Sequence, residues 1–193
     1  MFLRASKLRI KKKNTYKEQD PKKVKEFEKQ IEDIPKEKRC YVDESGFDTY
    51  YQREYGWAPK GEAVNDKILG RKYERRSIVA GKVNNEIIAP LEYRGTMHGE
   101  FFEKWFEDNL LPAISEDTVI IMDNASFHRK EKLYEIAKRY NRRLIFLPPY
   151  SPELNPIEHF WNWLKKKIPD VLKYVTNFED AICESLKIWN QRC

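Results

Sequence analysis

The sequence predicts an α/β domain with a mixed sheet, in which three largely antiparallel strands are followed by two further strands and flanked by helices. Three observations support this prediction. Short apolar runs in the first half are separated by turn signals, a continuous β-branched run occupies 118–122, and a helical pattern separates that run from another apolar run at 143–147. Because a strand, a helix and a strand in succession favour a crossover connection, we expect the last two strands to be parallel.

A short amphipathic helix is the first predicted element. Asp20 and Pro21 favour a helix start, and Pro35 ends the apolar pattern. One side of this helix carries the apolar residues Val24, Phe27, Ile31 and Ile34. We expect that side to pack against the main sheet.

The strands of the first half follow from their alternating or apolar runs. Residues 39–47 form a run that ends on an acid and a glycine, which is typical of a strand with the acid at its C-terminal end. Residues 49–57, a turn signal at 58–61, and the runs 77–83 and 86–91 are typical of antiparallel strands joined by tight turns, with Asn84-Asn85 as one turn.

The second half alternates helices with the last two strands. Aromatic and leucine residues recur at helical spacing from Gly99 to Ile114, which predicts a core-facing helix. After the β-branched strand we expect a helix over 130–140, the strand at 143–147, a helix that contains Glu158, and a last helix over 178–189. Asn155 is the expected cap of the Glu158 helix, with Pro156 in its first helical position.

Three acidic residues lie at the expected edges of these elements. Asp43 ends the first strand, Asp123 follows the β-branched strand, and Glu158 lies in the first turn of its helix. Crowded carboxylates repel one another unless a cation neutralises them. Hard oxygen ligands suit Mg²⁺ or Mn²⁺, and two such ions about 4 Å apart can hold the attacking and the leaving oxygen of a phosphodiester displacement. We therefore expect Asp43, Asp123 and Glu158 to be catalytic metal ligands for two ions.

Composition narrows the classes of function. Of 193 residues, 35% are charged and the formal net charge is +6, which favours polyanionic partners such as DNA or RNA. No apolar stretch reaches the roughly 20 residues of a membrane span, and the first residues lack a signal-peptide core, so we expect a cytoplasmic, nucleoid-associated protein. The three cysteines and three histidines lack the paired spacing of a disulfide framework or a zinc site.

Four motifs carry a resemblance to a known family. They are Tyr-Val-Asp-Glu-Ser-Gly-Phe at 41–47, Tyr-Gly-Trp-Ala-Pro-Lys-Gly at 55–61, Met-Asp-Asn-Ala-Ser-Phe-His at 122–128 and Leu-Pro-Pro-Tyr-Ser-Pro-Glu-Leu-Asn-Pro-Ile-Glu-His-Phe-Trp at 147–161. In this order and spacing the chain resembles insertion-sequence transposases of the mariner-like DDE superfamily, from about Tyr16 nearly to the C-terminus.

The resemblance implies an RNase H-like fold, a mixed five-stranded sheet flanked by helices, with the three acids binding Mg²⁺. It also implies DNA cleavage at transposon ends by a metal-activated water, followed by attack of the freed 3′-hydroxyl on target DNA. Double-stranded DNA is then the partner, and we further expect a homodimer.

Relatives carry an N-terminal helix-turn-helix region that recognises the terminal repeats, and this chain starts where that region ends. We expect residues 1–20 to be a basic arm or the stub of that region, and residues 21–193 to be the catalytic domain. Three explanations stay open: a truncated remnant, one half of a frameshifted gene, and a catalytic chain that works with a separate helix-turn-helix chain.

Other candidate residues have weaker support. Glu44 lies next to Asp43 and should point to the opposite face of the strand. His128 either orients a water or phosphate or ties its loop. Two basic clusters are candidate DNA contacts: Arg71, Lys72, Arg75 and Arg76 near a strand, and Lys165 and Lys166 on the Glu158 helix.

Two alternative functions share these residues. The first is an idle DNA-binding or dimerisation fragment that modulates an intact transposase, and it is favoured by the missing recognition region. The second is a nuclease of RNA–DNA hybrids, which shares the metal chemistry but not the Pro-Pro-Tyr-Ser-Pro and Asn-Pro-Ile-Glu motifs.

Overall fold

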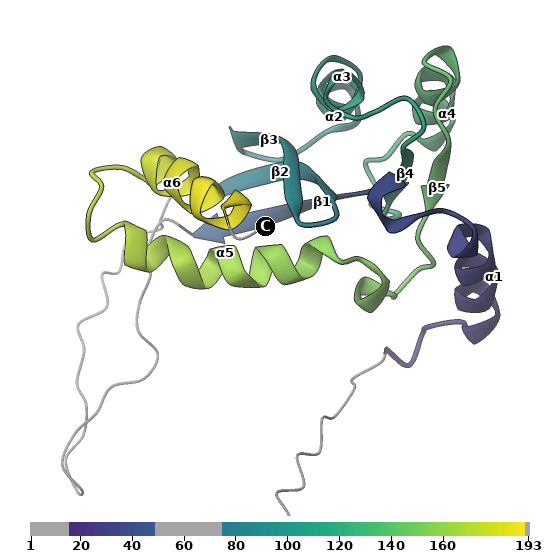
Figure 1. The fold of residues 1–193 in the computed structure, drawn as a ribbon, viewed down its shortest axis with the longest axis horizontal. Helices are drawn as coiled ribbons and strands as arrows, with labels where there is room; N and C mark the ends of the chain where they lie inside the picture. The colour runs from purple at the N-terminus through teal and green to yellow at the C-terminus, as the bar shows by residue number, and fades with distance from the viewer. Residues whose placement is uncertain (1–15, 49–74, 192–193) are drawn as a thin grey trace, which may run out of the picture.

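A five-stranded mixed sheet forms the centre of the computed structural model, which describes residues 16–48 and 75–191 (Figure 1). Its strand order is β3-β2-β1-β4-β5. The antiparallel pairs are β1–β2 and β2–β3, whereas β4 pairs in parallel with β1 and with β5. This confirms the predicted sheet. The strands are β1 (Arg39–Asp48), β2 (Arg75–Val83), β3 (Glu86–Arg94), β4 (Val119–Met122) and β5 (Leu144–Phe146).

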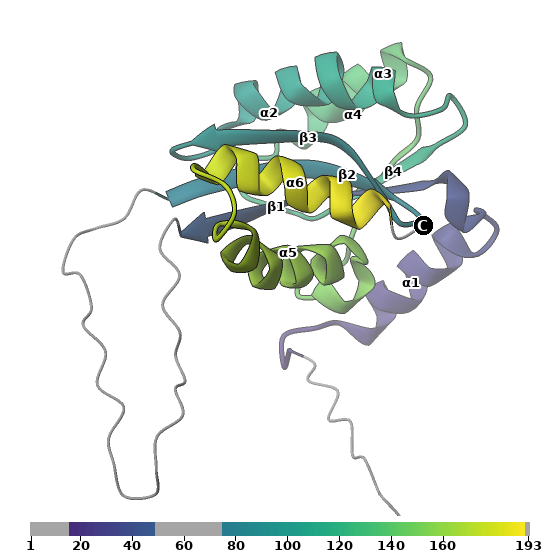
Figure 2. The ribbon, with the colours of Figure 1, turned by 60° about the vertical axis from the view of Figure 1, so that its left-hand side comes forward.

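Helices cover both faces of the sheet (Figure 2). The segment of α2 and α3 lies with α4 on one face, and α5, α6 and α1 lie on the other. The predicted helices are confirmed, and two short 3₁₀ turns add to them. The helical bounds are α1 (Pro21–Glu32), η1 (Lys36–Lys38), α2 (Gly99–Trp105), η2 (Phe106–Leu110), α3 (Leu111–Ala113), α4 (Lys130–Arg139), η3 (Pro152–Leu154), α5 (Ile157–Val171) and α6 (Phe178–Asn190).

The helix start at α1 follows the expected chemistry. Asp20 is the N-cap, and its side chain accepts a hydrogen bond of 2.9 Å from the backbone N–H of Lys22. Phe27 of α1 is buried in a cluster with Ile121 and Ile145 of the sheet. The apolar side of this helix therefore packs against the sheet as predicted.

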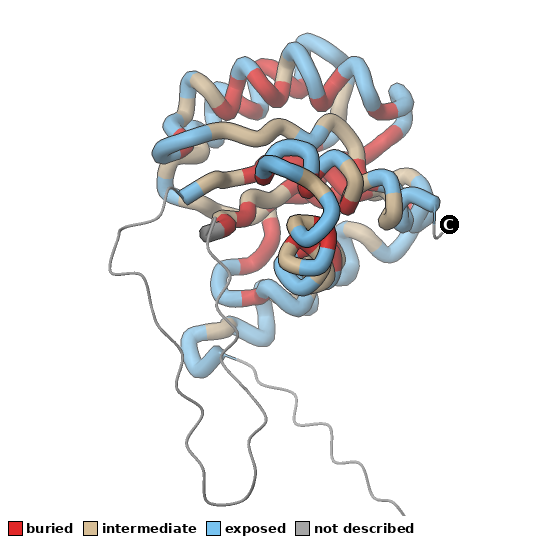
Figure 3. The backbone as a smooth tube through the Cα atoms, turned by 90° about the vertical axis from the view of Figure 1, so that its left-hand side faces the viewer, coloured by how far each residue is buried: buried red, intermediate tan, exposed pale blue. Residues whose placement is uncertain are grey.

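Alternation along the strands gives the two faces different roles. On β1, Cys40 and Val42 point to the core beneath α2 and α4, whereas Tyr41 and Phe47 point toward α1, α5 and α6. Asp43 belongs to the second set, because it is two residues from Tyr41. Figure 3 shows the resulting buried segments in the centre of the molecule and exposed outer turns on the helices.

A β-bulge interrupts the β2–β3 pairing opposite Asp43. The register shifts between Val79 and Gly81 of β2, at the level where Ala80 pairs with Asp43 on the other side. Ala89 has a positive φ of 47°, and Pro90 follows it in the strand. A proline is accommodated there because β3 is an edge strand.

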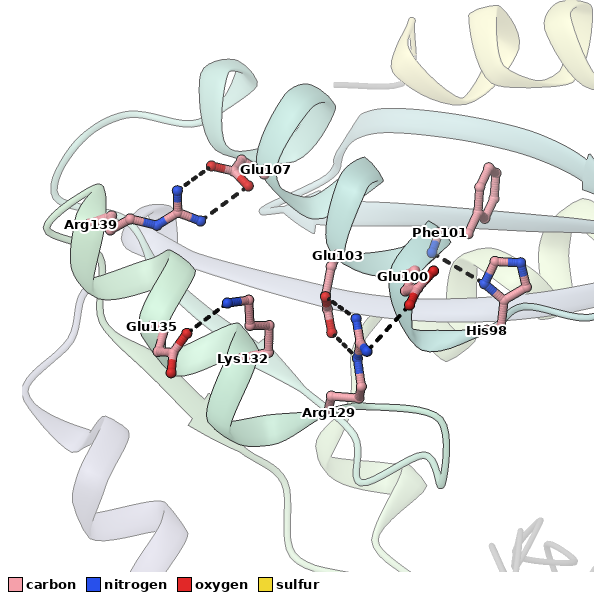
Figure 4. Close-up of polar contacts among 9 residues, drawn as sticks. All are labelled: His98, Glu100, Phe101, Glu103, Glu107, Arg129, Lys132, Glu135 and Arg139. Carbon is pink, nitrogen blue, oxygen red and sulfur yellow. Dashed lines mark hydrogen bonds and ion pairs between the residues drawn. The ribbon is translucent and has the colours of Figure 1, made fainter.

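The helix predicted from Gly99 to Ile114 contains a π-helical turn, η2, between α2 and α3. Ion pairs join the segment of α2 and η2 to α4 and to Arg129, the residue that precedes α4 (Figure 4). Arg129 contacts Glu103 through two hydrogen bonds of 2.7 and 2.6 Å, and Arg139 contacts Glu107 at 3.2 Å. Glu103, which is buried, and Glu107, which is half-buried, therefore each have an arginine partner within this helical layer.

Several expectations fall outside the described residues: the strand at 49–57, the turn at 58–61, the first part of the basic arm, and the basic residues Arg71 and Lys72. Among the described helices, none is long and apolar enough to cross a membrane.

Candidate functional site

Asp43 lies in the middle of β1, so the expectation that it ends a strand is wrong. β1 continues to Asp48 because β2 pairs with it along its whole length, and Asp43 itself pairs with Ala80. The other neighbour is shorter: β4 pairs with β1 only as far as Met122 opposite Val42. Asp43 is therefore the first residue of β1 beyond the end of β4, and this opening at the sheet exposes its carboxyl to the site.

Asp123 directly follows β4, as predicted. One carboxylate oxygen accepts a hydrogen bond of 3.2 Å from the backbone N–H of Ala125, which fixes the turn after the strand. Since β1 and β4 are parallel and Met122 is level with Val42, Asp123 and Asp43 are level on neighbouring strands. Side-chain alternation also places them on the same face.

Glu158 lies in the first turn of α5, as predicted, but the helix cap is different. α5 begins at Ile157 with Pro156 as its N-cap, so the expected cap at Asn155 is wrong by one residue. The backbone carbonyl of Asn155 accepts a hydrogen bond of 3.2 Å from the N–H of Glu158. The buried side-chain oxygen of Asn155 has no hydrogen-bond partner among the described residues.

A cavity of about 450 Å³ brings the three acids together. Asp43 lines it from β1, Asp123 from the end of β4, and Glu158 from α5. The segment 147–152, which contains Pro-Pro-Tyr-Ser-Pro, forms another wall. Three elements that are distant in sequence therefore meet at one site, and the prolines of the fourth motif shape its rim.

The close approach of the three acids affects the pKa of Asp43. Burial and, to a smaller extent, the negative charges of Glu158 and Asp123 together raise the pKa of Asp43 from 3.8 to about 7. The backbone N–H of Glu44 and the indole of Trp161 act in the opposite direction. Among the described residues, no cationic side chain forms an ion pair with Asp43. The site therefore holds a carboxyl group whose charge the neighbouring protein does not neutralise.

Trp161 of α5 is a further residue of the site. It is 1% exposed, and its indole N–H donates a hydrogen bond of 3.1 Å to Oδ2 of Asp43. It lies three residues after Glu158 in α5, so both side chains face the same side of the helix. That spacing was the available signal: a tryptophan on the same helix face as the candidate acid Glu158 is positioned to contact another acid of the site.

Glu44 lies on the opposite face of β1 from Asp43, as predicted. The hydroxyl of Tyr93 donates a hydrogen bond of 2.7 Å to Oε2 of Glu44. Burial raises the pKa of Glu44 to about 7, the Tyr93 hydroxyl lowers it, and the charge of Asp123 raises it. Glu44 does not line the cavity of the three acids.

His128 ties the loop after Asp123. Its side chain is buried against the rings of Phe102 and Phe127, each with its centroid 4.4 Å away. Burial lowers the pKa of His128, and the charge of Asp123 raises it less strongly. In the neutral ring, Nδ1–H donates to the backbone carbonyl of Asp123 at 3.2 Å. Of the two open interpretations, the geometry shows the loop contact.

Asn124 joins the loops that follow the two parallel strands. Its side-chain amide donates to the carbonyl of Leu147, and its side-chain oxygen accepts from the ammonium of Lys130. The amide therefore positions the loop after β5 beside the loop after β4. It holds one wall of the cavity against another.

The chain matches the family described as DDE superfamily endonuclease over residues 38–180, which is more than half of its length. The chain belongs to this family. A curated relative, the uncharacterized protein y4pE/y4sA of Sinorhizobium fredii (strain NBRC 101917 / NGR234), is 36% identical over 78 residues, covering 38% of this chain and 51% of the relative. The chain thus spans about half the length of that relative.

Solved structures show the same fold as this DDE family member at low identity. The crystal structure of the catalytic domain of Mos1 mariner transposase has a TM-score of 0.54 at 12% identity, with 88% of this chain and 87% of that chain covered. The Mos1 strand transfer complex has a TM-score of 0.65 at 12% identity, covering 95% of this chain and 64% of that chain. The chain has the RNase H-like fold, and it spans less than two thirds of the complete Mos1 chain.

The donor set of this DDE domain suits a hard divalent ion, because three carboxylates offer oxygen ligands and excess negative charge. In the described part of the chain, no three His, Cys, Asp or Glu side chains are yet arranged so that they hold one ion together. Among the solved structures are Mos1 paired end complexes with Mg and with Mn.

The expected DNA-contact residues lie in different surroundings. Arg75 is exposed at the start of β2, whereas Arg76 is paired with Glu92 at 2.6 Å and with Glu179 at 3.1 Å. Lys165 and Lys166 are exposed on α5. The ammonium of Lys165 lies 5.7 Å from the ring centroid of Phe47. Their contact with DNA stays a prediction.

Proposed function

We propose that this chain is the catalytic domain of a transposase, which cleaves DNA at transposon ends and transfers the 3′-hydroxyl into target DNA. The observation that carries the proposal is the shared cavity of Asp43, Asp123 and Glu158 in a DDE superfamily endonuclease domain. The raised pKa of Asp43 supports it, because a carboxyl held near two other acids gains most from a bound cation. The fold shared with the Mos1 catalytic domain supports it further.

The three acids act as ligands for Mg²⁺ or Mn²⁺, and we propose two ions. When bound, such ions activate the attacking oxygen and stabilise the leaving one. Asp43 and Asp123 from neighbouring strands and Glu158 from the helix would hold the ions, and a bound cation would offset the repulsion among the three carboxylates. Trp161 holds Asp43 in orientation throughout.

The reaction consists of two phosphoryl transfers. Water attacks a phosphodiester at the transposon end, and the bond to the 3′-oxygen breaks, which leaves a 3′-hydroxyl. That hydroxyl then attacks a phosphodiester of the target DNA, a new bond forms, and the old 3′-oxygen leaves with a proton. Both steps use the same carboxylates, and no covalent bond to the enzyme forms.

We propose residues 21–193 as the catalytic domain and residues 1–20 as a basic arm or the stub of a recognition region. Double-stranded DNA is the partner, and the active form is a homodimer. The Mos1 structures described as paired end complexes support this arrangement.

A plasmid-nicking assay tests the proposal. The full chain is incubated with supercoiled plasmid that carries the element's own ends, in Mg²⁺ or Mn²⁺, and nicked circles are measured. Asp123→Ala should abolish metal-dependent nicking with little loss of folding. Asp108→Ala, an exposed acid in η2, is the matched control and should nick normally. Nicking retained in Asp123→Ala would remove the assignment of the three acids.

A further inference from the structure

Asn155 is a buried polar residue of the catalytic cavity whose side chain has no partner in the described part of the chain. It is 4% exposed, and it lines the cavity together with Asp43, Asp123 and Glu158. The oxygen of its amide is fully buried and accepts no hydrogen bond from the described residues. The amide nitrogen also donates to no group of the described chain, but it is not fully buried. The nitrogen is therefore the end of this amide that a ligand can reach.

Helix capping does not account for this asparagine. α5 has Pro156 as its N-cap and no side-chain cap hydrogen bond. The backbone of Asn155 is already paired, because its N–H donates to the carbonyl of Pro152 at 3.0 Å and its carbonyl accepts from the N–H of Glu158 at 3.2 Å. An amide oxygen that is buried without a partner is unfavourable compared with an apolar side chain of the same shape. Neither packing nor capping therefore explains a polar side chain at this position.

The backbone contact with Glu158 holds the amide beside the acids. Since the carbonyl of Asn155 accepts from the N–H of Glu158, the two residues are joined across the first turn of α5. Asn155 itself is extended, with φ −106° and ψ 97°, and the proline ring that follows fixes the next φ at −64°. The place of the amide relative to Glu158 is thus set by paired and restricted backbone.

The other walls of the cavity offer few unused hydrogen-bond donors. Among the described residues that line it, none is a lysine, an arginine or a histidine. Asn124 and Ser151 each donate to a backbone carbonyl of the walls, and the lining tyrosines, Tyr16 and Tyr150, are exposed. A phosphodiester at the three acids carries its negative charge on two non-bridging oxygens. The neutral amide of Asn155 can donate to one of them without competing with metal ions for the carboxylates, as an ammonium would.

We propose that Asn155 is a further catalytic residue, whose amide nitrogen donates a hydrogen bond to a non-bridging oxygen of the scissile phosphate. The proposal rests on the proposed function and extends it by one contact with the substrate. A donor that the fold already holds in place needs no reorganisation when the phosphate reacts. The amide therefore positions the phosphate against the acids and stabilises its charge during transfer.

Asn155→Leu separates a substrate contact from a structural role. Leucine has nearly the shape of asparagine and removes the unpaired oxygen, so in EDTA the variant should unfold at the same urea concentration as the unmodified chain or a higher one. Its metal-dependent nicking in a single turnover should be about twentyfold slower, because a hydrogen bond to a charged oxygen is lost. Asn109→Leu, which changes an exposed asparagine of η2, is the matched control and should nick normally. Unchanged nicking in Asn155→Leu would overturn the proposal.

A double-mutant cycle between protein and DNA identifies the oxygen. Three duplexes with the element's own end are compared. One has an ordinary scissile phosphate, and in the other two one or the other non-bridging oxygen is replaced by sulfur, which is a weaker acceptor. The loss caused by Asn155→Leu should be about twentyfold with the ordinary duplex and with one stereoisomer, but less than about threefold with the other. Equal losses with all three duplexes would overturn the contact.

Asn155→Asp distinguishes a donor from an acceptor. It keeps the shape and the oxygen, removes both N–H groups, and adds a negative charge beside the acids. Nicking should fall at least as far as in Asn155→Leu, with a smaller loss on the same stereoisomer. If Asn155→Leu is less stable than the unmodified chain, the duplex comparison with Asn155→Asp decides. Nicking retained in Asn155→Asp would show that the amide acts through its oxygen, which contradicts the proposal.

These outcomes separate the two proposals. Metal-dependent nicking that is insensitive to Asn155→Leu would remove the substrate contact and leave the catalytic proposal standing. An absence of nicking by the unmodified chain would remove the proposed function, and the contact with it.

Discussion

Two carboxyl groups on opposite faces of the sheet show how the protein treats buried negative charge. Glu103 is 7% exposed beneath α4, and Arg129 neutralises it through two hydrogen bonds of 2.7 and 2.6 Å (Figure 4). Asp43 is partly buried on the other face, where its side chain accepts one hydrogen bond from Trp161 and its closest charged influences are acids. Among the residues that the structure describes, one acid has a cationic partner and the other has none.

Under the proposed function, this difference separates a structural acid from a functional one. A buried carboxylate with a guanidinium partner stabilises the packing of its layer, provided the partner remains. A carboxylate whose pKa is raised to about 7 by burial and by neighbouring acids destabilises the metal-free fold and binds an external cation more strongly. Neutralising each side chain should therefore have opposite effects on stability, and only one should affect catalysis.

The largest expected effect is the loss of DNA nicking in the variant Asp43→Asn. Removing one ligand charge should lower metal-dependent nicking about a thousandfold or more, because the attacking and leaving oxygens lose their stabilisation. Nicked plasmid is measured over time in Mg²⁺. Glu103→Gln, assayed below its melting temperature, should nick at nearly the rate of the unmodified chain. Equal losses in the two variants would erase the functional distinction between the faces.

The sequence predicts the sheet and the places of Asp123 and Glu158 in it, for identifiable reasons. The β-branched run 118–122 has only one favourable place, a strand buried on both faces, so Asp123 had to lie where that strand ends. Pro152 and Pro156 delay the helix until Ile157, which places Glu158 in its first turn. The places of Asp123 and Glu158 therefore follow from the residues next to them in the sequence.

Features that depend on distant partners were not predictable in the same way. Asp43 was expected at a strand end. The length of β1 is instead set by its pairing with β2, and β2 begins 32 positions after Asp43. The ion pairs of Arg76 come from β3 and α6. Lys82 was not singled out, because a lysine near a turn is typical of an exposed position, and only packing shows it buried.

The second prediction concerns the stability of the α4 layer. Glu103→Gln should lower the free energy of unfolding by about 1–2 kcal/mol, because the guanidinium of Arg129 loses its charged partner and one of its two hydrogen bonds to this side chain. Urea denaturation at neutral pH measures the change. Glu135→Gln, which removes an exposed pair with Lys132, is the control and should change stability much less than Glu103→Gln does.

The third prediction is that Asp43→Asn raises the free energy of unfolding in EDTA, whereas Glu103→Gln lowers it. The folded-state pKa of Asp43 is raised from 3.8 to about 7, so this carboxyl ionises more readily in the unfolded chain. The unmodified chain therefore loses stability through this carboxyl as the pH rises from about 4 to about 7. The whole loss is at most about 4 kcal/mol. Solvent in the cavity screens part of this loss, so the variant should be about 2 kcal/mol more stable than the unmodified chain at pH 8.

At pH 3 the two proteins should unfold at nearly the same urea concentration, because the carboxyl is then protonated in the folded state and mostly protonated in the unfolded state. Added Mg²⁺ should raise the stability of the unmodified chain and should have a much smaller effect on Asp43→Asn. A variant that is less stable than the unmodified chain at pH 8 in EDTA would contradict the electrostatic account of the cavity.

The smallest expected effect distinguishes two tryptophans that make the same kind of bond on opposite faces. Trp161→Phe removes the N–H that donates to Asp43, and Trp105→Phe removes one that donates to the carbonyl of Ala89 at 2.9 Å. The two variants should lower stability by similar amounts, since each loses one partly buried hydrogen bond and part of a fully buried ring. Only Trp161→Phe should also slow nicking, by about tenfold, because Asp43 loses the contact that orients it toward the ions. If Trp105→Phe slowed nicking equally, the indole of Trp161 would be a packing group, and the orientation of Asp43 would have to come from the strand alone.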